Sequence, residues 1–341
     1  MAMPDRYSRQ TRFAPLGDAG QHRLAAARVA LIGCGALGTH LADALARAGV
    51  GFLRILDRDT VEPSNLQRQI LFDEADAAAG APKAVAAANR LASINSEITV
   101  EPVLADVRPD NIESFVTDCA LILDATDNFE IRFLINDVAV KHRLPWIYGA
   151  CVGATGMVLP IVPGQTPCLR CLWNEPPPPG ISPTCDTAGI LAPAAAVTAA
   201  LQAAEALKLL SGNATAVSRR LVQFDLWANT FDAFDWQAAP DCPCCVHGRF
   251  DHLNSTAGRT AALCGRNAVQ IAATPGATVD FARVAEQVRP AAKNPPTFNR
   301  YLLRFTVDRF AVTLFSDGRA IIHGTDSPEE ARTVYARYIG A

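Results

Sequence analysis

A strand, a glycine-rich turn, a helix and a second strand that ends in acidic residues constrain this chain most. They occupy the stretch RVALIGCGALGTHLADALARAGVGFLRILDRD near the N-terminus. The turn carries three glycines, Gly33, Gly35 and Gly38. Glycines at this spacing permit a tight turn and a close approach of backbone to phosphate at a helix N-terminus. We therefore expect a nucleotide-binding unit in which Asp57, at the end of the second strand, holds a ribose hydroxyl.

Apolar runs alternate with helical patterns from Val29 to about Ala150. The expected strands are Val29–Ile32, Leu53–Leu56, Ile98–Val103, Ala120–Leu123 and Trp146–Tyr148. The expected helices between them are Leu37–Ala48, Pro82–Ile94 and Ile131–His142. Short strands separated by helices of this length are typical of an α/β, Rossmann-like, doubly wound and mostly parallel sheet.

The rest of the chain divides into segments of different character. Four consecutive prolines in NEPPPPGISPTCDTAG predict a crossover loop over about 174–187, followed by a helix that starts near Thr187. Apolar runs within 219–238 indicate an added antiparallel pair. We expect a nucleotide-binding domain over 1–248, a linker over 249–262 and a small α+β domain of unknown role over 263–341.

Composition excludes several classes of protein. A formal net charge of -3 and a pI near 6.1 provide no electrostatic footprint for nucleic acid or an anionic membrane. The Ala-rich stretch from Ile190 to Leu210 carries polar residues that favour a buried helix over a membrane span. No signal peptide is recognisable, so the 10 cysteines are not expected to form a disulfide framework, and we expect a cytoplasmic protein.

Polar residues after the glycine turn decide between two nucleotide chemistries. Asn65, Arg68, Lys83 and Asp127 follow it, and Asp59 lies two residues beyond Asp57. Two cations suit a triphosphate, and a carboxylate after a strand suits Mg²⁺. An NAD-dependent oxidoreductase would use the glycine turn but would have no role for these side chains. Taken singly, Arg68, Lys83 and Asp127 also have an ordinary interpretation, as a surface Arg, a surface Lys and a helix-capping Asp.

The cysteine spacing indicates a metal site. Cys168 and Cys171 form one C-x-x-C pair, and Cys242 and Cys245 form a second about 70 residues later. Four thiolates make a closed tetrahedral zinc site, which is structural because no position stays open. Cys244 is an alternative to Cys245, and a redox-active C-x-x-C is an alternative to zinc.

Taken together, the motifs RYSRQ, GCGALG, LDRDTVEPSNLQRQ, PKA, ATDN, the two C-x-x-C pairs and TCDTAGILAP resemble those of the MoeB/ThiF family. These relatives of ubiquitin-activating enzymes adenylate the C-terminal Gly-Gly of ubiquitin-like sulfur-carrier proteins. The resemblance implies that the nucleotide is ATP, with Asp57 on its ribose and Asp59 close by. It implies that Asn65, Arg68 and Lys83 contact the phosphates and that Asp127 coordinates Mg²⁺.

The resemblance also implies partners. The arginine that matches Arg9 reaches the phosphates of a neighbouring subunit, which implies a homodimer with two composite sites. Residues 263–341 lack the six-residue active loop of a rhodanese domain, so a separate protein would donate sulfur. A non-catalytic scaffold that binds a ubiquitin-like partner is a further alternative.

The remaining cysteines differ in their expected roles. Cys185 follows the prolines, and in some family members this cysteine carries sulfur-transfer chemistry; a loop-packing residue is the alternative. Cys264, next to Arg266, has a conceivable sulfur-accepting role, although a plain loop cysteine is favoured. Cys34, Cys119 and Cys151 are expected to be small buried hydrophobic residues.

Overall fold

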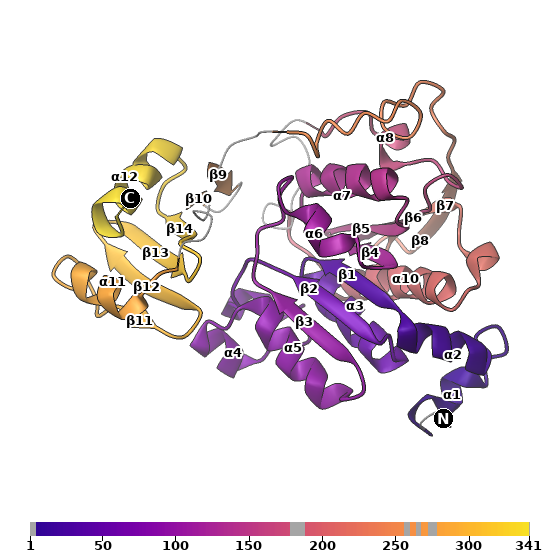
Figure 1. The fold of residues 1–341 in the computed structure, drawn as a ribbon, viewed down its shortest axis with the longest axis horizontal. Coiled ribbons are helices and arrows are strands. Elements are labelled where there is room, and N and C mark those ends of the chain that lie inside the picture. Colours follow the sequence, from indigo (N-terminus) through magenta and orange to yellow (C-terminus); the bar gives the residue numbers. More distant parts are fainter. Residues whose placement is uncertain (1–4, 178–187, 256–259, 264–266, 272–277, 341) are drawn as a thin grey trace. The chain divides into compact units, whose positions relative to one another are not determined.

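The computed structural model describes residues 5–177, 188–255, 260–263, 267–271 and 278–340. The chain divides into two compact units, Met1–Ser255 and Thr256–Ala341 (Figure 1). Within the described residues, no helix combines the length and the apolar character that crossing a bilayer requires.

The first unit is built on one mixed sheet of eight strands in the order β3-β2-β1-β4-β5-β6-β7-β8. The first five strands along the chain are parallel to one another: β1 (Arg28–Ile32), β2 (Phe52–Leu56), β3 (Thr99–Val103), β4 (Leu121–Asp124) and β5 (Trp146–Val152). Three antiparallel strands extend the sheet: β6 (Thr155–Ile161), β7 (Arg220–Asp225) and β8 (Thr230–Asp235). The expected Rossmann-like α/β class with an added antiparallel pair is confirmed.

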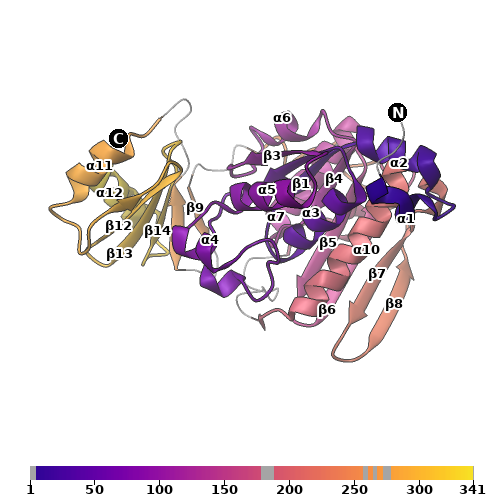
Figure 2. The ribbon, with the colours of Figure 1, turned by 90° about the horizontal axis from the view of Figure 1, so that it is seen from below.

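Helices cover both faces of this sheet (Figures 1 and 2). One face packs against α3 (Ala36–Ala48), α5 (Lys83–Ile94) and α10 (Ala192–Leu210), and the other against α6 (Ile112–Val116), α7 (Phe129–His142) and α8 (Leu169–Leu172). Within β1, Val29 and Leu31 join the first core, whereas Ala30 and Ile32 join the second. Side chains alternate across a strand, so a strand covered on both faces must be apolar throughout.

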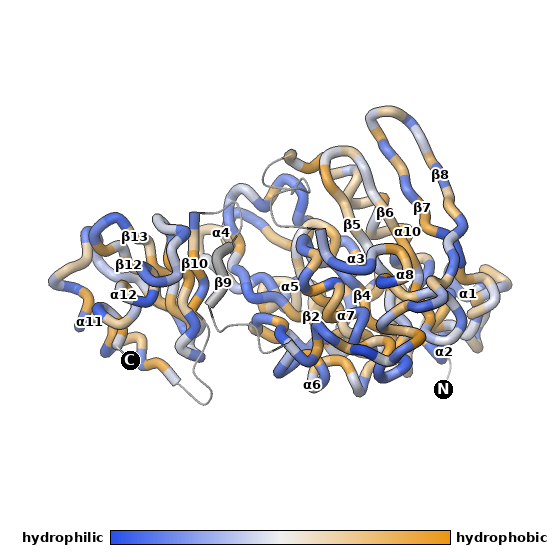
Figure 3. Tube along the Cα trace, turned by 90° about the horizontal axis from the view of Figure 1, so that it is seen from above, coloured by the Kyte–Doolittle hydropathy of each residue, from blue (hydrophilic) through white to orange (hydrophobic). Residues whose placement is uncertain are grey.

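Short elements complete the first unit. They are the helical turn η1 (Asp5–Tyr7), the helices α1 (Ser8–Thr11), α2 (Gly17–Ala26) and α4 (Glu74–Ala79), and the turns η2 (Pro63–Asn65) and η3 (Ala214–Ala216). Along β7 and β8, apolar and polar residues are mixed, as the colours of Figure 3 show. This mixture fits strands at the open end of the sheet, which are not covered on both faces.

Most expected strands and helices of this unit are confirmed to within two residues. Strand β6 was not expected, because Gly156 and Pro160 interrupt its apolar run. Pro160 pairs with Ile147 of β5, whereas β6 pairs with β7 only from Thr155 to Val158, so Pro160 lies beyond the stretch in which a proline would interrupt the β7 ladder. The helix expected from near Thr187 begins at Ala192, with Pro193 in its first turn, where proline is favoured.

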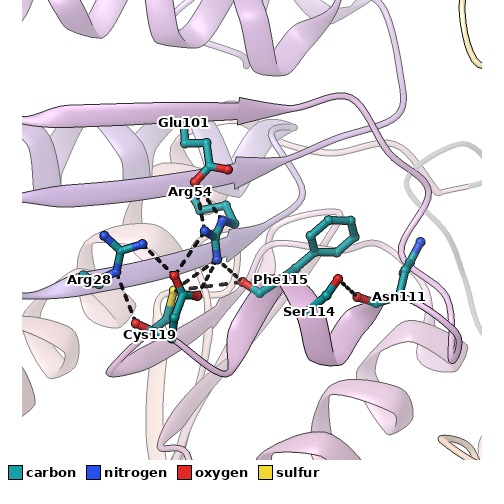
Figure 4. A network of polar contacts seen from close by, with 8 residues as sticks. Arg28, Arg54, Glu101, Asn111, Ser114, Phe115 and Cys119 are labelled. Atoms are coloured by element: carbon teal, nitrogen blue, oxygen red, sulfur yellow. Dashed lines mark hydrogen bonds and ion pairs between the residues drawn. The ribbon is translucent and has the colours of Figure 1, made fainter.

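A polar network ties the starts of the parallel strands to the end of α6 (Figure 4). Arg54, on β2 and 9% exposed, donates to Glu101 at 3.0 Å, to Asp118 at 2.5 Å and to the Phe115 carbonyl at 2.7 Å. Arg28 donates to the same Asp118 at 2.6 Å. Arg54, through its hydrogen bonds above all, holds the pKa of Asp118 well below its usual range, and Arg28 lowers it further.

This arrangement predicts a pH-dependent contribution to stability. A carboxyl whose folded-state pKa is lowered stabilises the fold above its unfolded pKa of about 3.9, and that contribution disappears as the pH falls through the folded pKa. Asp118 is 47% exposed, so we expect Asp118→Asn to lower the free energy of unfolding by only about 1 kcal/mol at pH 7. In urea titrations the difference from wild type should persist to about pH 4 and narrow below it. A difference that widens on acidification would contradict this assignment.

The second unit has an antiparallel sheet in the order β11-β12-β13-β14-β10-β9. Its strands are β9 (Thr260–Leu263), β10 (Ala268–Ile271), β11 (Thr297–Phe298), β12 (Leu302–Val307), β13 (Phe310–Phe315) and β14 (Ala320–His323). Helices α11 (Phe281–Val288) and α12 (Pro328–Tyr338) pack Val284, Val288 and Val334 into one core with strand residues such as Leu303 and Ile322. The small α+β composition expected of this part of the chain is confirmed.

Candidate active site

The glycine turn links β1 to α3 and requires glycine at two positions. Gly33 has φ +95°, and a Cβ added there would lie 2.5 Å from the Ala125 carbonyl oxygen. A Cβ added at Gly38 would lie 2.1 Å from the carbonyl oxygen of Gly33. Neither position can accept a side chain without displacing backbone, so the turn is held tightly against the end of β4.

Gly35 differs, because the space before it is open. Among the described residues, only Gln69 Nε2 comes within 4 Å of a Cβ added at Gly35, at 3.8 Å. A cradle that a side chain would fill, at the N-terminus of a 13-residue helix, fits a phosphate group. The Gln69 side chain is 3% exposed, and its Oε1 has no hydrogen-bond partner among the described atoms.

Sequence reasoning did not single out Gln69, which lies two residues beyond the exposed Gln67. Both glutamines flank Arg68, and nothing in the local pattern separates them. Only the backbone path after η2 turns Gln69 toward the glycine turn.

Asp57 ties the glycine turn to the end of β2. Its Oδ2 accepts the Cys34 N–H at 2.7 Å, and its Oδ1 accepts the Asp59 N–H at 2.7 Å. Burial raises the pKa of Asp57, and the positive charge of Lys83 opposes this shift. The carboxylate therefore stands at the junction where a dinucleotide-type site holds a ribose.

Lys83 is the first residue of α5 and is 6% exposed. Its Nζ lies 3.3 Å from Asp59 Oδ2, and its N–H donates to the Asp59 carbonyl at 2.9 Å. Arg58 lies beside this pair and donates to Asp106 at 2.8 Å. The structure thus brings Asp57, Asp59 and Lys83 together next to the glycine turn.

Asn65 and Arg68 belong to the segment that carries Gln69. Asn65 is buried, and its Oδ1 accepts the Glu62 N–H at 3.1 Å, which closes the turn η2. Arg68 is half-buried, and its Nη1 donates to the Ser64 carbonyl at 2.8 Å. Asn65 therefore has an evident structural role, whereas among the described residues the Arg68 guanidinium is engaged only by backbone on its own turn.

The loop between β4 and α7 carries Asp127. Asn128, not Asp127, caps α7, because its side chain accepts the Ile131 N–H at 2.9 Å. The exposed Asp127 carboxylate is therefore not used as the cap, which was its ordinary interpretation. Burial opposes the charge of Arg58, but Asp106 above all, with Asp59 and to the smallest extent Asp127, raises the pKa of Arg58.

A buried ion pair that sequence reasoning missed shapes this loop. Arg132 donates to Asp124 at 3.2 Å and to the Thr126 carbonyl at 2.7 Å, and Asp124 accepts the Thr126 N–H at 2.9 Å. Asp124 and Arg132 are 0% and 6% exposed. Asp124 directly precedes the motif ATDN in the sequence, yet its partner comes from the following helix.

Arg9 lies far from the glycine turn. It is exposed on α1 and has no side-chain partner among the described residues. Its neighbour Gln10 donates to the Ala48 carbonyl at 2.9 Å, which fixes α1 at the C-terminal end of α3. The glycine turn is at the other end of that helix, about 18 Å away, farther than an arginine side chain extends.

The two C-x-x-C pairs converge. The Sγ atoms of Cys168, Cys171, Cys242 and Cys245 all lie within 4.8 Å of one another. Three of their separations are 3.5 Å for Cys168–Cys242, 3.5 Å for Cys171–Cys245 and 4.0 Å for Cys168–Cys171. Tetrahedral zinc with Zn–S bonds of about 2.3 Å needs sulfurs about 3.8 Å apart, so the four thiols fit zinc.

The other cysteines fall into two groups. Cys34, Cys119 and Cys151 are buried as expected, and burial raises the pKa of the Cys34 and Cys119 thiols, the latter to about 11. Cys185 and Cys264 lie outside the described residues.

Comparisons with known proteins agree with this arrangement. The ThiF family model matches residues 7–244. The sulfur carrier protein ThiS adenylyltransferase of Bacillus subtilis is 45% identical over 343 residues, which cover 99% of this chain and 100% of that protein. The SAMP-activating enzyme E1 of Haloferax volcanii is 39% identical over 249 residues, covering 73% of this chain and 91% of that protein.

Solved structures place the fold in the same group. The crystal structure of E. coli MccB with ATP matches at 25% identity with a TM-score of 0.60, over 71% of this chain and 75% of that chain. The glycine turn, the acid and lysine beside it and three of the four converging cysteines thus lie in the part of the chain that the family model covers, which ends one residue before Cys245. The chain belongs to the ThiF family.

Proposed function

We propose that this protein adenylates the C-terminal Gly-Gly carboxylate of a ubiquitin-like sulfur-carrier protein, with ATP as the nucleotide. The observation that carries the proposal is the open cradle at Gly35 beside Asp57, Asp59 and the buried Lys83. Relatives named as sulfur-carrier adenylyltransferases support it over hydride transfer or a non-catalytic scaffold.

The reaction requires no covalent catalysis by the protein in its adenylation step. A carboxylate oxygen of the carrier attacks the α-phosphorus of ATP, the bond to the β-phosphate bridging oxygen breaks, and pyrophosphate leaves. The product is an acyl adenylate, and a sulfur nucleophile supplied by a donor protein then attacks its acyl carbon and displaces AMP to leave a thiocarboxylate. Catalysis is then mainly positioning and stabilisation of charge on the phosphates.

The site residues have distinct proposed roles. Gly33 and Gly38 hold the turn, Gly35 leaves room for phosphate, and Asp57 accepts a ribose hydroxyl. Lys83 and Arg68 stabilise phosphate charge, Asn65 fixes the turn that carries Arg68, and Asp59 orients Lys83. Mg²⁺, held by Asp127, would neutralise charge on the leaving pyrophosphate.

Arg9 would act on a second copy of the chain. Because α1 is fixed at the end of α3 opposite the glycine turn, Arg9 cannot serve the cradle of its own chain. A two-fold homodimer would bring it to the partner's phosphates, and symmetry makes the exchange reciprocal.

The four converging thiols would hold one structural zinc. The metal ligands would be Cys168, Cys171, Cys242 and Cys245, which leaves no open position for chemistry. Thiols kept reduced for a metal fit a cytoplasmic location.

Mass spectrometry of the purified protein with ATP, Mg²⁺ and candidate carriers tests the function. We expect the carrier to gain the mass of AMP, and labelled pyrophosphate to exchange into ATP only when carrier is present. No adenylate with any Gly-Gly carrier, together with a nicotinamide absorbance in the purified protein, would contradict the proposal.

Cys185 is proposed to form the covalent link in sulfur transfer from a separate donor protein. We expect Cys185→Ser to form adenylate at the wild-type rate but to lose most thiocarboxylate product, because the carrier carboxylate is the nucleophile of the first step and only the later step needs one from the enzyme. The measurement is the mass of the carrier after addition of donor. Full thiocarboxylate formation by the variant would exclude this role.

The second unit is proposed to serve interactions and not the chemical step. The match to the Haloferax enzyme takes in 91% of that protein, which leaves too little of it for a counterpart of this unit. We therefore expect a chain ending at Ser255 to keep adenylate formation, measured by carrier-dependent exchange. Complete loss of exchange by a folded truncated chain would contradict this role.

A further inference from the structure

Helix α7 lies beside the cysteine cluster and carries two fully buried polar residues there, Asn136 and Asp137, each 0% exposed. Neither is needed to cap the helix or to form the candidate nucleotide site. A buried amide and a buried carboxyl cost free energy unless they are hydrogen-bonded, so their partners show what they do.

Asn136 contacts both C-x-x-C segments at once. Its Oδ1 accepts the N–H of Leu169, the residue after Cys168, at 2.8 Å. Its Nδ2 donates to the Sγ of Cys244, the residue before Cys245, at 3.3 Å. One side chain thus bridges two segments that lie more than 70 residues apart in the sequence.

The neighbouring Asp137 attaches a further segment of the chain to α7. Its Oδ2 accepts the N–H groups of His252 and Leu253 at 2.9 Å and 3.3 Å. These residues follow the second cysteine pair along the chain. Helix α7 therefore holds the first cysteine pair, the second pair and the segment that leaves it.

Cys244 occupies a different environment from its neighbours. It is 0% exposed and packs with Cys168 and Cys242, but its sulfur receives the Asn136 amide. Cys245 is the residue whose sulfur joins the other three within 4.8 Å. A sulfur that accepts a buried amide N–H and lies outside the four-sulfur group is poorly placed to become a ligand.

We propose that Asn136 is the positioning residue of the four-cysteine centre: it sets the spacing of the two C-x-x-C pairs and directs Cys245, not Cys244, to the metal. The proposal rests on the zinc binding proposed above. Outer partners that fix metal ligands typically change metal affinity by about 10- to 100-fold when they are removed.

Zinc release from the full chain tests this role. Asn136→Leu keeps the number and branching of the side-chain heavy atoms and removes both hydrogen bonds, and we expect its zinc affinity to fall by about 10- to 100-fold in competition with a chromogenic chelator. Cys244→Ala should still bind one zinc per chain, whereas Cys245→Ser should lose it. These measurements need neither ATP nor carrier.

Asn95→Leu provides a matched control. Asn95 is also a buried asparagine, 1% exposed, and it donates to the Tyr7 hydroxyl at 2.9 Å and the Ala46 carbonyl at 2.7 Å. It should lower thermal stability yet keep wild-type zinc affinity. This control separates a loss of zinc positioning from a general loss of stability.

Three results would overturn the inference in distinguishable ways. Wild-type zinc affinity in Asn136→Leu would remove the positioning role while leaving the zinc site intact. Zinc loss in Cys244→Ala with retention in Cys245→Ser would reverse the ligand assignment. Wild-type protein that folds without any bound zinc would refute the zinc proposal itself, and the inference with it.

Discussion

Arg68→Ala is expected to lower carrier-dependent ATP–pyrophosphate exchange by about 100- to 1000-fold, the usual effect of removing one group that stabilises transition-state charge. In the part of the chain that the structure describes, the guanidinium of Arg68 donates only to the Ser64 carbonyl of its own turn, so its removal leaves no buried charge behind there. The folded state should therefore survive, as judged by circular dichroism and an unchanged thermal midpoint.

A surface arginine in the same unit provides the control for this experiment. Arg90 is exposed on α5, the helix that Lys83 begins. Arg90→Ala should exchange pyrophosphate at the wild-type rate. Near-normal exchange by Arg68→Ala would remove Arg68 from the phosphate site and would weaken the assignment of the whole site.

Cys242→Ser is expected to abolish zinc binding and to destabilise the first unit. Metal binding at a closed site contributes directly to folding free energy. A loss of several kcal/mol corresponds to a fall in the thermal midpoint of about 10 °C for a unit of this size. Zinc content by atomic absorption and a calorimetric scan measure the two effects together.

The loss of stability in Cys242→Ser should affect the core of the first unit as well as the cysteine cluster. Cys168 is followed by the helix α8, whose Leu169 packs in the core on the α7 face of the sheet. Cys151→Ser, which alters a buried cysteine outside the cluster, is the matched control and should retain one zinc per chain. A Cys242→Ser protein with wild-type zinc content would refute the ligand set.

Much of the fold was predictable because its signals are local. Strands buried on both faces are continuous apolar runs, and helices such as Leu37–Ala48 repeat their apolar residues at helical spacing. Strand β6 escaped prediction because its pairing decides whether Pro160 can be tolerated, and pairing is a property of the sheet.

Part of the candidate site was likewise predictable from the sequence, and part was not. Glycine spacing, the acid at the end of β2 and the cysteine pairs are visible in the sequence, because each depends on a few consecutive residues. Gln69, the Asp124–Arg132 pair and Asn136 were missed, because their roles depend on partners from other elements.

The sequence by itself determined the class of fold, the nucleotide-binding turn and the four cysteines that could hold a metal. Only the tertiary structure decided which glycine leaves space for a phosphate, which amino acid caps α7 and which cysteine stands apart from the cluster. The physical reason is that backbone geometry and hydrophobic periodicity are encoded over short stretches. Hydrogen bonds of buried side chains are fixed only when distant segments pack together.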